Sequence, residues 1–183
     1  MNREEALQIL KQNLRNRNLV NHCIATEVVM KRLAQHFGED EAKWALAGLL
    51  HDIDYEETKD DPERHSAVGA EMLEQMGLPQ DIVYAVKVHN ERHGLPRLSL
   101  MDKALYATDP TTGLIVAGAL IKPEKKLSAI DVDFLIKRMK EKSFARGANR
   151  DQIRSCEELG LSLEEFLGLS LEAMQGAADE LGL

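Results

Sequence analysis

The spacing of the apolar residues is the feature that most constrains the fold. These residues recur at intervals of three and four along nearly the whole chain, as Ala6, Leu7, Leu10 and Leu14 do near its start. Residues at this spacing share one face of an α-helix, whereas a half-buried strand needs strict alternation. Aromatic residues are only 4% of the sequence, and no two alternating β-branched segments are joined by a hairpin turn. We therefore expect an all-α fold.

Capping and breaking signals divide this pattern into helices. Ser99 and Ser162 open capping boxes, and Asp61-Pro62 is a typical helix start. Asp109-Pro110 is expected to interrupt a helix, because proline lacks a backbone N–H and restricts the residue before it. A chain of 183 residues has room for one substantial core, so we expect a single domain over residues 1–183. The expected helices, roughly nine, cover residues from about 3, 19–37, 40–50, 61–77, 79–93, 99–121, from about 128, 150–159 and from about 162.

Charge and cysteine content exclude several classes of protein. The chain has 31 acidic and 23 basic side chains and a formal net charge of -8, which disfavours broad nucleic-acid binding. Cys23 and Cys156 lack CxxC spacing, so neither a disulfide framework nor a thiolate zinc site is expected. The N-terminal segment lacks an apolar signal region, and the longest apolar stretch, residues 114–121, is too short to span a bilayer. We expect a cytoplasmic protein without a membrane segment.

The histidines are the most informative residues for function. A histidine on a helix is usually exposed or hydrogen-bonded in the core, and we interpret His36 in this way. His51-Asp52 differs, because it ends an apolar helix and a buried carboxylate without a basic neighbour costs several kcal/mol. A metal ion would offset that cost, and imidazoles with carboxylates suit Zn, Mn, Fe or Ni in a helical bundle. The six histidines are His22, His36, His51, His65, His89 and His93.

The order of these residues resembles the HD-domain superfamily of metal-dependent phosphohydrolases, whose name comes from the His-Asp pair. The resemblance is carried by His22, Leu49-Leu50-His51-Asp52-Ile53, Asp109, His65 in HisSerAlaValGlyAlaGluMetLeu and His89 in AlaValLysValHisAsn. Beyond Asp109, the segments ThrThrGlyLeuIleValAlaGlyAlaLeuIle and LysGluLysSerPheAlaArgGlyAlaAsnArg are similar to an HDIG-like branch of uncharacterised bacterial hydrolases. The resemblance implies a helical bundle with a motif-bearing core at about 18–122 and a C-terminal helical extension at about 123–183.

The resemblance also implies a role for each of these residues. Asp52 would bridge to a second metal held by His65 and His89, and His51 and Asp52 would be catalytic. The short connection at residues 77–79 independently predicts that His65 and His89 lie at the same end of an antiparallel helix pair. The implied ligands of the first metal are His22, His51, Asp52 and Asp109.

Two positions depart from the pattern of the family. Asp54 stands where glycine is common, and Asn90 stands where a second histidine is common. Because one ligand of the second site is then absent, we expect one or two divalent ions. His93, one helical turn beyond His89, is an alternative ligand.

These expectations lead to a hydrolytic function. Bound divalent metal, which could be Mn, Fe, Ni, Co, Zn or Mg, lowers the pKa of water and polarises a phosphoryl oxygen. The sequence has no GxxxxGK[ST], GxGxxG or GxSxG motif, so it lacks the usual residues for nucleotide-driven reactions and for serine hydrolysis. We predict hydrolysis of a small phosphorylated metabolite or nucleotide. An HD-type di-iron oxygenase and a non-catalytic metal or phosphate binding module remain alternatives, and the oligomeric state stays open.

A basic segment near the C-terminus offers donors for substrate phosphate. Basic side chains recur between residues 137 and 150 of an otherwise acidic chain. They form either a solvated face or a phosphate clamp, for which Arg146 and Arg150 are the candidates because guanidinium groups bind phosphate with two donors. Glu56 and Glu57 would either protonate a leaving group or lie on the surface.

Overall fold

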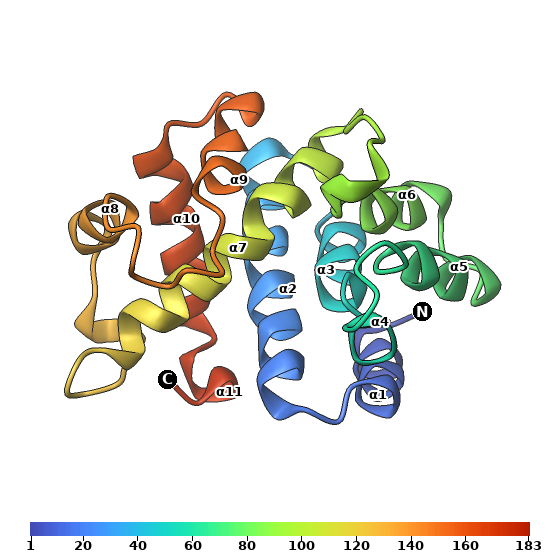
Figure 1. Cartoon of the computed structure of the whole chain (residues 1–183), viewed down its shortest axis with the longest axis horizontal. Coiled ribbons are helices and arrows are strands. Elements are labelled where there is room, and N and C mark those ends of the chain that lie inside the picture. The colour runs from blue at the N-terminus through green and yellow to red at the C-terminus, as the bar shows by residue number, and fades with distance from the viewer.

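A computed structural model describes residues 1–183, which form helices, turns and no strand, so the predicted all-α fold is confirmed. Figure 1 shows the arrangement of these helices. No helix is both long and apolar enough to cross a lipid bilayer. The α-helices are α1 (Arg3–Asn13), α2 (Arg17–Phe37), α3 (Glu41–Leu50), α4 (Tyr55–Thr58), α5 (Ala67–Gln75), α6 (Gln80–Val88), α7 (Leu100–Leu120), α8 (Val132–Met139), α9 (Arg150–Arg154), α10 (Leu163–Gly176) and α11 (Ala178–Leu181), and the 3₁₀ segments are η1 (Glu91–His93), η2 (Leu127–Ala129) and η3 (Ser155–Leu159).

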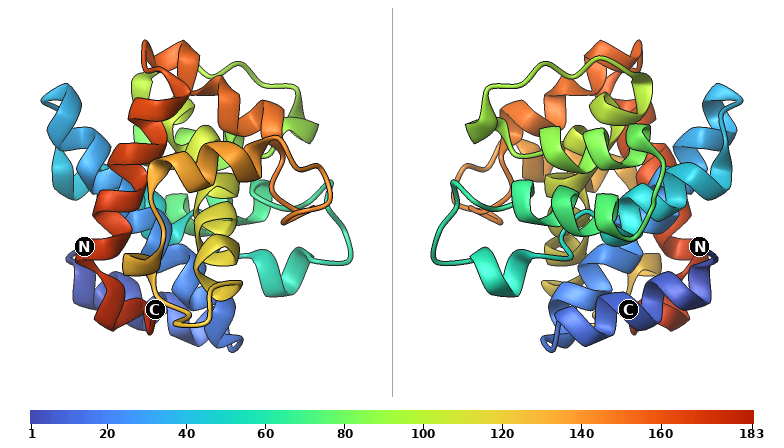
Figure 2. Two further views of the ribbon diagram at one scale, coloured as in Figure 1. Left: turned by 90° about the vertical axis from the view of Figure 1, so that its left-hand side faces the viewer. Right: turned by 90° about the vertical axis from the view of Figure 1, so that its right-hand side faces the viewer.

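Helix α2 is the centre of the bundle. It packs against α3, α7 and α10, and α7 crosses in front of it in Figure 1. Helices α5 and α6 pack on each other beside α3, while α8 and α10 cover the opposite side. One continuous cluster of buried apolar side chains extends from α1 to α11. Two segments project from the same side of this bundle, namely the one around α4 and the one that follows α8 (Figure 2).

The contact between α2 and α3 is unusually close at Gly48. A Cβ atom at this position would lie 2.8 Å from the carbonyl oxygen of Thr26 and 2.9 Å from the backbone of Glu27. Real Cβ atoms do not approach backbone atoms so closely, so the absence of a side chain at Gly48 sets the distance between the two helices. The same contact holds the end of α3 against α2.

The expected break at Asp109-Pro110 is wrong, because α7 runs without interruption from Leu100 to Leu120. Pro110 has no N–H to donate to the carbonyl of Tyr106, four residues earlier. The side-chain amide of Gln152 donates to that carbonyl instead, at 2.8 Å. A residue far along the chain thereby supplies the hydrogen bond that proline cannot make.

Two other expected helix starts are displaced. Asp61-Pro62 does not begin a helix, since residues up to His65 form turns and α5 begins at Ala67. Ser66 precedes α5 with a left-handed backbone (φ 66°), which is uncommon for a residue other than glycine. Helix α8 begins at Val132 and is capped by Asp131, three residues after the expected start at Ser128.

Candidate metal centre

Six side chains from five parts of the chain converge at the middle of the bundle. They are the six residues for which the sequence predicts metal binding, and the structure brings all of them together. His22 comes from α2, His51 and Asp52 from the end of α3, His65 from the turn before α5, His89 from the end of α6 and Asp109 from α7.

One group of donors forms around His22. Its Nε2 atom lies 3.0 Å from Oδ1 of Asp109, 3.2 Å from Nε2 of His51 and 3.6 Å from Oδ2 of Asp52. These four residues are the ligand set expected for the first metal. Their donor atoms surround one small space.

A second group forms around the other oxygen of Asp52. Its Oδ1 atom lies 3.3 Å from Nε2 of His65 and 3.5 Å from Nε2 of His89. Nε2 of His51 is also 3.5 Å from Oδ1, so the carboxylate lies between the two groups of imidazoles. A carboxylate in this position is able to bridge two cations.

Hydrogen bonds at the opposite ring nitrogens orient three of the imidazoles. Nδ1 of His51 donates to the carbonyl of Gly48 at 2.8 Å, and Nδ1 of His89 donates to the carbonyl of Val86 at 2.6 Å. The hydroxyl of Thr112 donates to the carbonyl of Asp109 at 2.9 Å and so accepts from Nδ1 of His22 at 3.0 Å. A neutral imidazole carries one proton, so in each ring the Nε2 lone pair faces the centre.

This donor set fits a metal ion. Lone pairs on Nε2 of His22 and His51 face each other at 3.2 Å, and the buried Nε2 of His89 has no hydrogen-bond partner. Such an arrangement needs a cation or additional protons at its centre. Three or more imidazole and carboxylate donors with their second nitrogens anchored are typical of divalent metal sites.

The electrostatics of the cluster lead to the same conclusion. Burial alone would raise the pKa of Asp52, but His51 and the other imidazoles hold that pKa well below its ordinary value. Burial would lower the pKa of His51, but Asp52 and Asp109 raise it well above its ordinary value. The buried carboxylate of Asp52 and the partly exposed carboxylate of Asp109 thus stabilise positive charge in the cluster, and metal binding would displace protons that otherwise supply it.

The structure separates the two arginines of the predicted phosphate clamp. The terminal nitrogens of Arg150 donate to the backbone carbonyls of Ala145 (2.9 Å), Ala148 (2.6 Å), Phe144 (2.5 Å), Glu141 (3.2 Å) and Arg138 (3.4 Å). These bonds hold the segment after α8 in shape and leave the guanidinium no terminal donor for phosphate. The prediction that Arg150 contacts substrate phosphate is therefore wrong, and its role in the structure is to hold this segment.

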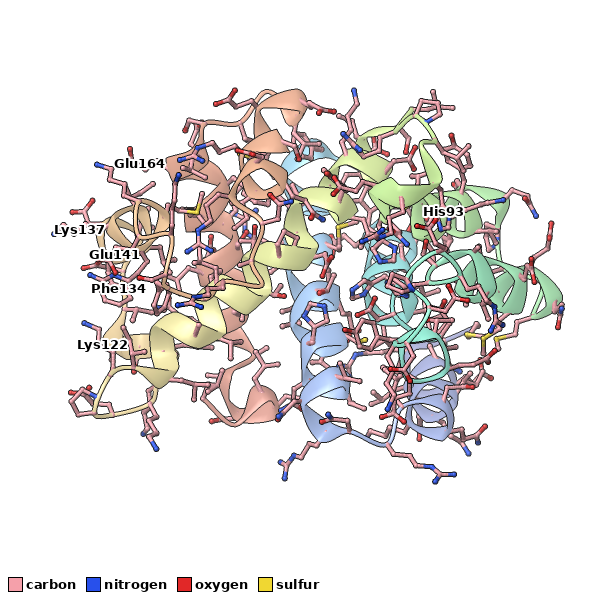
Figure 3. The ribbon with its side chains drawn as sticks, viewed as in Figure 1. His93, Lys122, Phe134, Lys137, Glu141 and Glu164 are labelled. Carbon is pink, nitrogen blue, oxygen red and sulfur yellow. The ribbon has the colours of Figure 1, made fainter.

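Arg146, in contrast, is exposed and lines a cavity beside the centre. That cavity, of about 350 Å³, is also lined by His22 and Asp109. Arg146 is therefore near enough to the predicted metal ligands to meet a bound phosphate. Lys137, which belongs to the same basic segment, lies at the far side of α8 in Figure 3 and does not line this cavity.

Several residues with open alternatives have other partners. His93, labelled in Figure 3, does not face the centre, because its Nε2 contacts the carbonyl of His65 at 2.8 Å. Glu56 accepts from the backbone N–H groups of Arg15 and Asn16, at 2.8 and 2.7 Å. Glu57 pairs with the exposed Arg64 at 3.1 Å. We therefore interpret these three side chains as structural or surface residues.

Two residues near the centre are not predicted from the sequence. Thr112 orients His22 through the hydrogen bond described above, and Asp54 approaches His65 to 3.3 Å. Thr112 stands three residues after Asp109 on one helix, which is the spacing of neighbours on a helical face. Asp54 is visible in the sequence only as an additional carboxylate two residues after Asp52.

Two larger cavities adjoin the centre. A groove of about 650 Å³ lies between α2 and α7 and shares His22, Gly113 and Ala117 with the cavity beside Arg146. Its other walls are mostly apolar. A polar cavity of about 510 Å³ opens on the opposite side, over His65, His89, Asp109, Arg92 and Gln152.

Comparisons with known proteins agree with this geometry. The profile of the HD domain matches residues 19–143, which contain all six converging residues. Ribonuclease Y of Lawsonia intracellularis is 32% identical over 100 residues, which cover 52% of this chain and 19% of that protein. Ribonuclease Y of Mycoplasma genitalium is 33% identical over 76 residues, which cover 42% of this chain and 16% of that protein.

A shorter relative is matched over more of its length. The symmetrical bis(5'-nucleosyl)-tetraphosphatase of Bacillus subtilis is 28% identical over 130 residues, which cover 60% of this chain and 68% of that protein. By contrast, the chain spans only about a fifth of the length of the Lawsonia ribonuclease Y. The profile match covers more than half of the chain. The chain belongs to the HD-domain family.

Proposed function

We propose that this chain hydrolyses a small phosphorylated metabolite or nucleotide, with His22, His51, Asp52 and Asp109 holding one divalent metal. The observation that carries the proposal is the Asp52 carboxylate, whose two oxygens face imidazole Nε2 atoms on both sides at 3.3–3.6 Å. A divalent metal bound there supplies a Lewis acid and a water molecule of lowered pKa. The side chains would orient the reactants, and the apolar core behind His51 would keep bulk water out.

The substrate phosphate would lie at the mouth of the centre. His22 and Asp109 line the cavity that Arg146 faces, and their side chains are 22% and 29% exposed, whereas His51 is fully buried. Solvent therefore reaches the centre at His22 and Asp109 on this side. A guanidinium at this mouth would neutralise and orient a phosphate group.

The remainder of the substrate would occupy the groove between α2 and α7. The groove begins at His22 and Gly113, and its apolar lining includes Val116 and Leu120. A Cβ atom at Gly113 would meet no atom within 4 Å, so this position keeps the passage open without a packing role. A nucleoside joined to the phosphate suits such a site, because apolar walls can pack on the faces of its base while Asn18 and Asn21, which also line the groove, can meet its polar groups.

The charge and the relatives guide the choice of substrate. The net charge of -8 opposes binding of a long polyanion unless basic residues gather on one face, so we propose a small substrate. The Bacillus subtilis tetraphosphatase supports testing dinucleoside tetraphosphates, and the ribonuclease Y relatives support including a short RNA.

We extend two other expectations to the whole chain. Helix α10 follows the matched region, yet it packs against α2 and α7, which supports one domain with a C-terminal helical extension. Cys23 and Cys156 are buried free thiols, in keeping with a reducing, cytoplasmic location.

The test is a substrate panel on metal-stripped protein reconstituted separately with Mn, Fe, Co, Ni, Zn and Mg. The panel contains nucleotides, a dinucleoside tetraphosphate, sugar phosphates and a short RNA, and phosphate release or chain cleavage is measured beside an Asp52→Ala control. Metal-dependent hydrolysis absent from the control supports the proposal. Iron-dependent oxygen consumption without hydrolysis would assign the oxygenase alternative, and binding without turnover would assign a binding module.

A further inference from the structure

The carboxylate of Asp54 is buried directly behind His65. The residue is 1% exposed. Its Oδ2 atom accepts from the backbone N–H of Ser66 at 2.8 Å, and its Oδ1 atom lies 3.3 Å from Nδ1 of His65. Both atoms are buried, and neither makes a hydrogen bond of ordinary geometry with any group. The two otherwise unpaired atoms face each other.

This pairing determines which nitrogen of His65 carries the proton. An ionised carboxylate only accepts hydrogen bonds, so Nδ1 of His65 must donate to it. In the neutral ring, which is the form that binds a metal, the lone pair then resides on Nε2, which lies 3.3 Å from Oδ1 of Asp52. His65 would otherwise be free to present an N–H to the second site, because no backbone carbonyl accepts from its Nδ1 as one does for His51 and His89.

The surrounding chain is built to hold this contact. Ser66 adopts the left-handed backbone (φ 66°) that brings its N–H to Asp54, and residues in such conformations persist only where their surroundings impose them. Asn90 and His93 both contact the carbonyl of His65, at 3.0 and 2.8 Å. A Cβ atom at Gly69 would come within 2.9 Å of Oδ1 of Asp54, so glycine at that position leaves room for the carboxylate.

We propose that Asp54 is a positioning residue that holds His65 in the Nδ1–H tautomer and so completes a second divalent-metal site formed with Asp52 and His89. The inference rests on the proposed function and adds a determinant to it. Among the four imidazoles of the centre, His65 alone is anchored by a carboxylate, since the others use backbone carbonyls or the hydroxyl of Thr112. The charge of Asp54 would strengthen the second site, in which Asn90 is turned away toward backbone carbonyls.

The substitution Asp54→Asn isolates this effect. The amide oxygen keeps an acceptor for the N–H of Ser66, while the amide nitrogen faces Nδ1 of His65. Nδ1 must then accept, and the proton moves to Nε2, where it blocks metal binding. Loss of a carboxylate behind a metal-binding histidine typically weakens metal affinity by about 10–100-fold, and we expect that loss for the second equivalent alone.

The experiment is a calorimetric titration of metal-stripped protein with Zn²⁺. Wild type should bind two equivalents, and Asp54→Asn should keep the first while its second resembles that of a His65→Ala, His89→Ala double variant. Thr58→Val is the matched control, because the Thr58 hydroxyl donates mainly to the backbone carbonyl of Asp54, at 2.9 Å. It reaches Oδ2 of Asp54 only at 3.5 Å, and its removal leaves the carboxylate itself in place. This control should bind both equivalents normally.

A nitrogen-15 NMR spectrum of the Zn²⁺-loaded protein reports the tautomer of His65 directly. We expect a protonated Nδ1 in wild type and in Thr58→Val, and its loss in Asp54→Asn. A second equivalent of unchanged affinity in Asp54→Asn overturns the proposal, and so does a single equivalent in wild type. Neither result depends on turnover, so hydrolysis by a one-metal enzyme would leave the proposed function intact while the role of Asp54 failed.

Discussion

Replacing Arg150 and Arg146 separately with alanine distinguishes a structural arginine from one that meets substrate. Arg150→Ala removes donors to five backbone carbonyls at 2.5–3.4 Å. A net contribution of about 1 kcal/mol for each of the two or three shortest bonds, with water replacing the rest, gives a loss of about 2–3 kcal/mol. For a chain of this length that corresponds to a fall in Tm of about 4–12 °C.

Arg146→Ala should have the opposite signature. Arg146 is exposed, and surface substitutions usually change stability by less than about 0.5 kcal/mol. Loss of a charge-assisted contact to phosphate should lower kcat/KM by about tenfold or more with metal content unchanged. The assays are differential scanning calorimetry, metal analysis and steady-state kinetics on the best substrate of the panel. An unchanged Tm with a tenfold loss of kcat/KM in Arg150→Ala would refute the structural assignment. Normal kinetics in Arg146→Ala would show that Arg146 is a solvated surface residue without a role in substrate binding.

Three further substitutions test the centre and its surroundings. Asp52→Ala should release metal and abolish hydrolysis, because this carboxylate faces both groups of imidazoles. Metal analysis and turnover measurements check this, and near-normal turnover would contradict it. Val116→Trp should fill the groove without reaching the cavity beside Arg146, and it should raise KM about tenfold for a nucleotide but not for methyl phosphate. Equal effects on both substrates would argue against a substrate groove. Gly48→Ala should destabilise the protein by about 1–3 kcal/mol through overpacking, since its Cβ would lie 2.8 Å from a carbonyl of α2. Thermal unfolding measures this loss, and an unchanged Tm would show that α2 and α3 move apart at no cost in stability.

Local signals in the sequence predict part of the fold well. Ser99 and Ser162 begin helices through the capping boxes that the sequence indicates, because such motifs involve residues only three apart. Pro110 misleads for the converse reason, since its missing hydrogen bond is replaced by Gln152 from another element. The turn at His65 also departs from expectation, because Asp54 and Asn90 hold it through contacts that no local pattern encodes.

The residues of the centre could be named from the sequence chiefly through the family pattern. The His51-Asp52 pair alone indicates a metal site, because it follows a buried apolar segment. Periodicity could not show that His22 and Asp109 meet it, since they come from other helices. The role of Arg150 could not be predicted, because a run of basic residues in the sequence does not show that this guanidinium turns inward to backbone carbonyls.

Helices α3 and α6 end in the same way, so the centre contains the same local ligand geometry twice. His51 and His89 are each the residue at which a helix stops, and each ring bonds to the carbonyl three residues earlier in its own helix. The orientation of each ring is thus set by the last turn of its own helix and does not depend on a neighbouring helix. An apolar helix that ends in histidine could therefore be transferred to a designed bundle as a metal-binding unit whose imidazole is already oriented by its own helix.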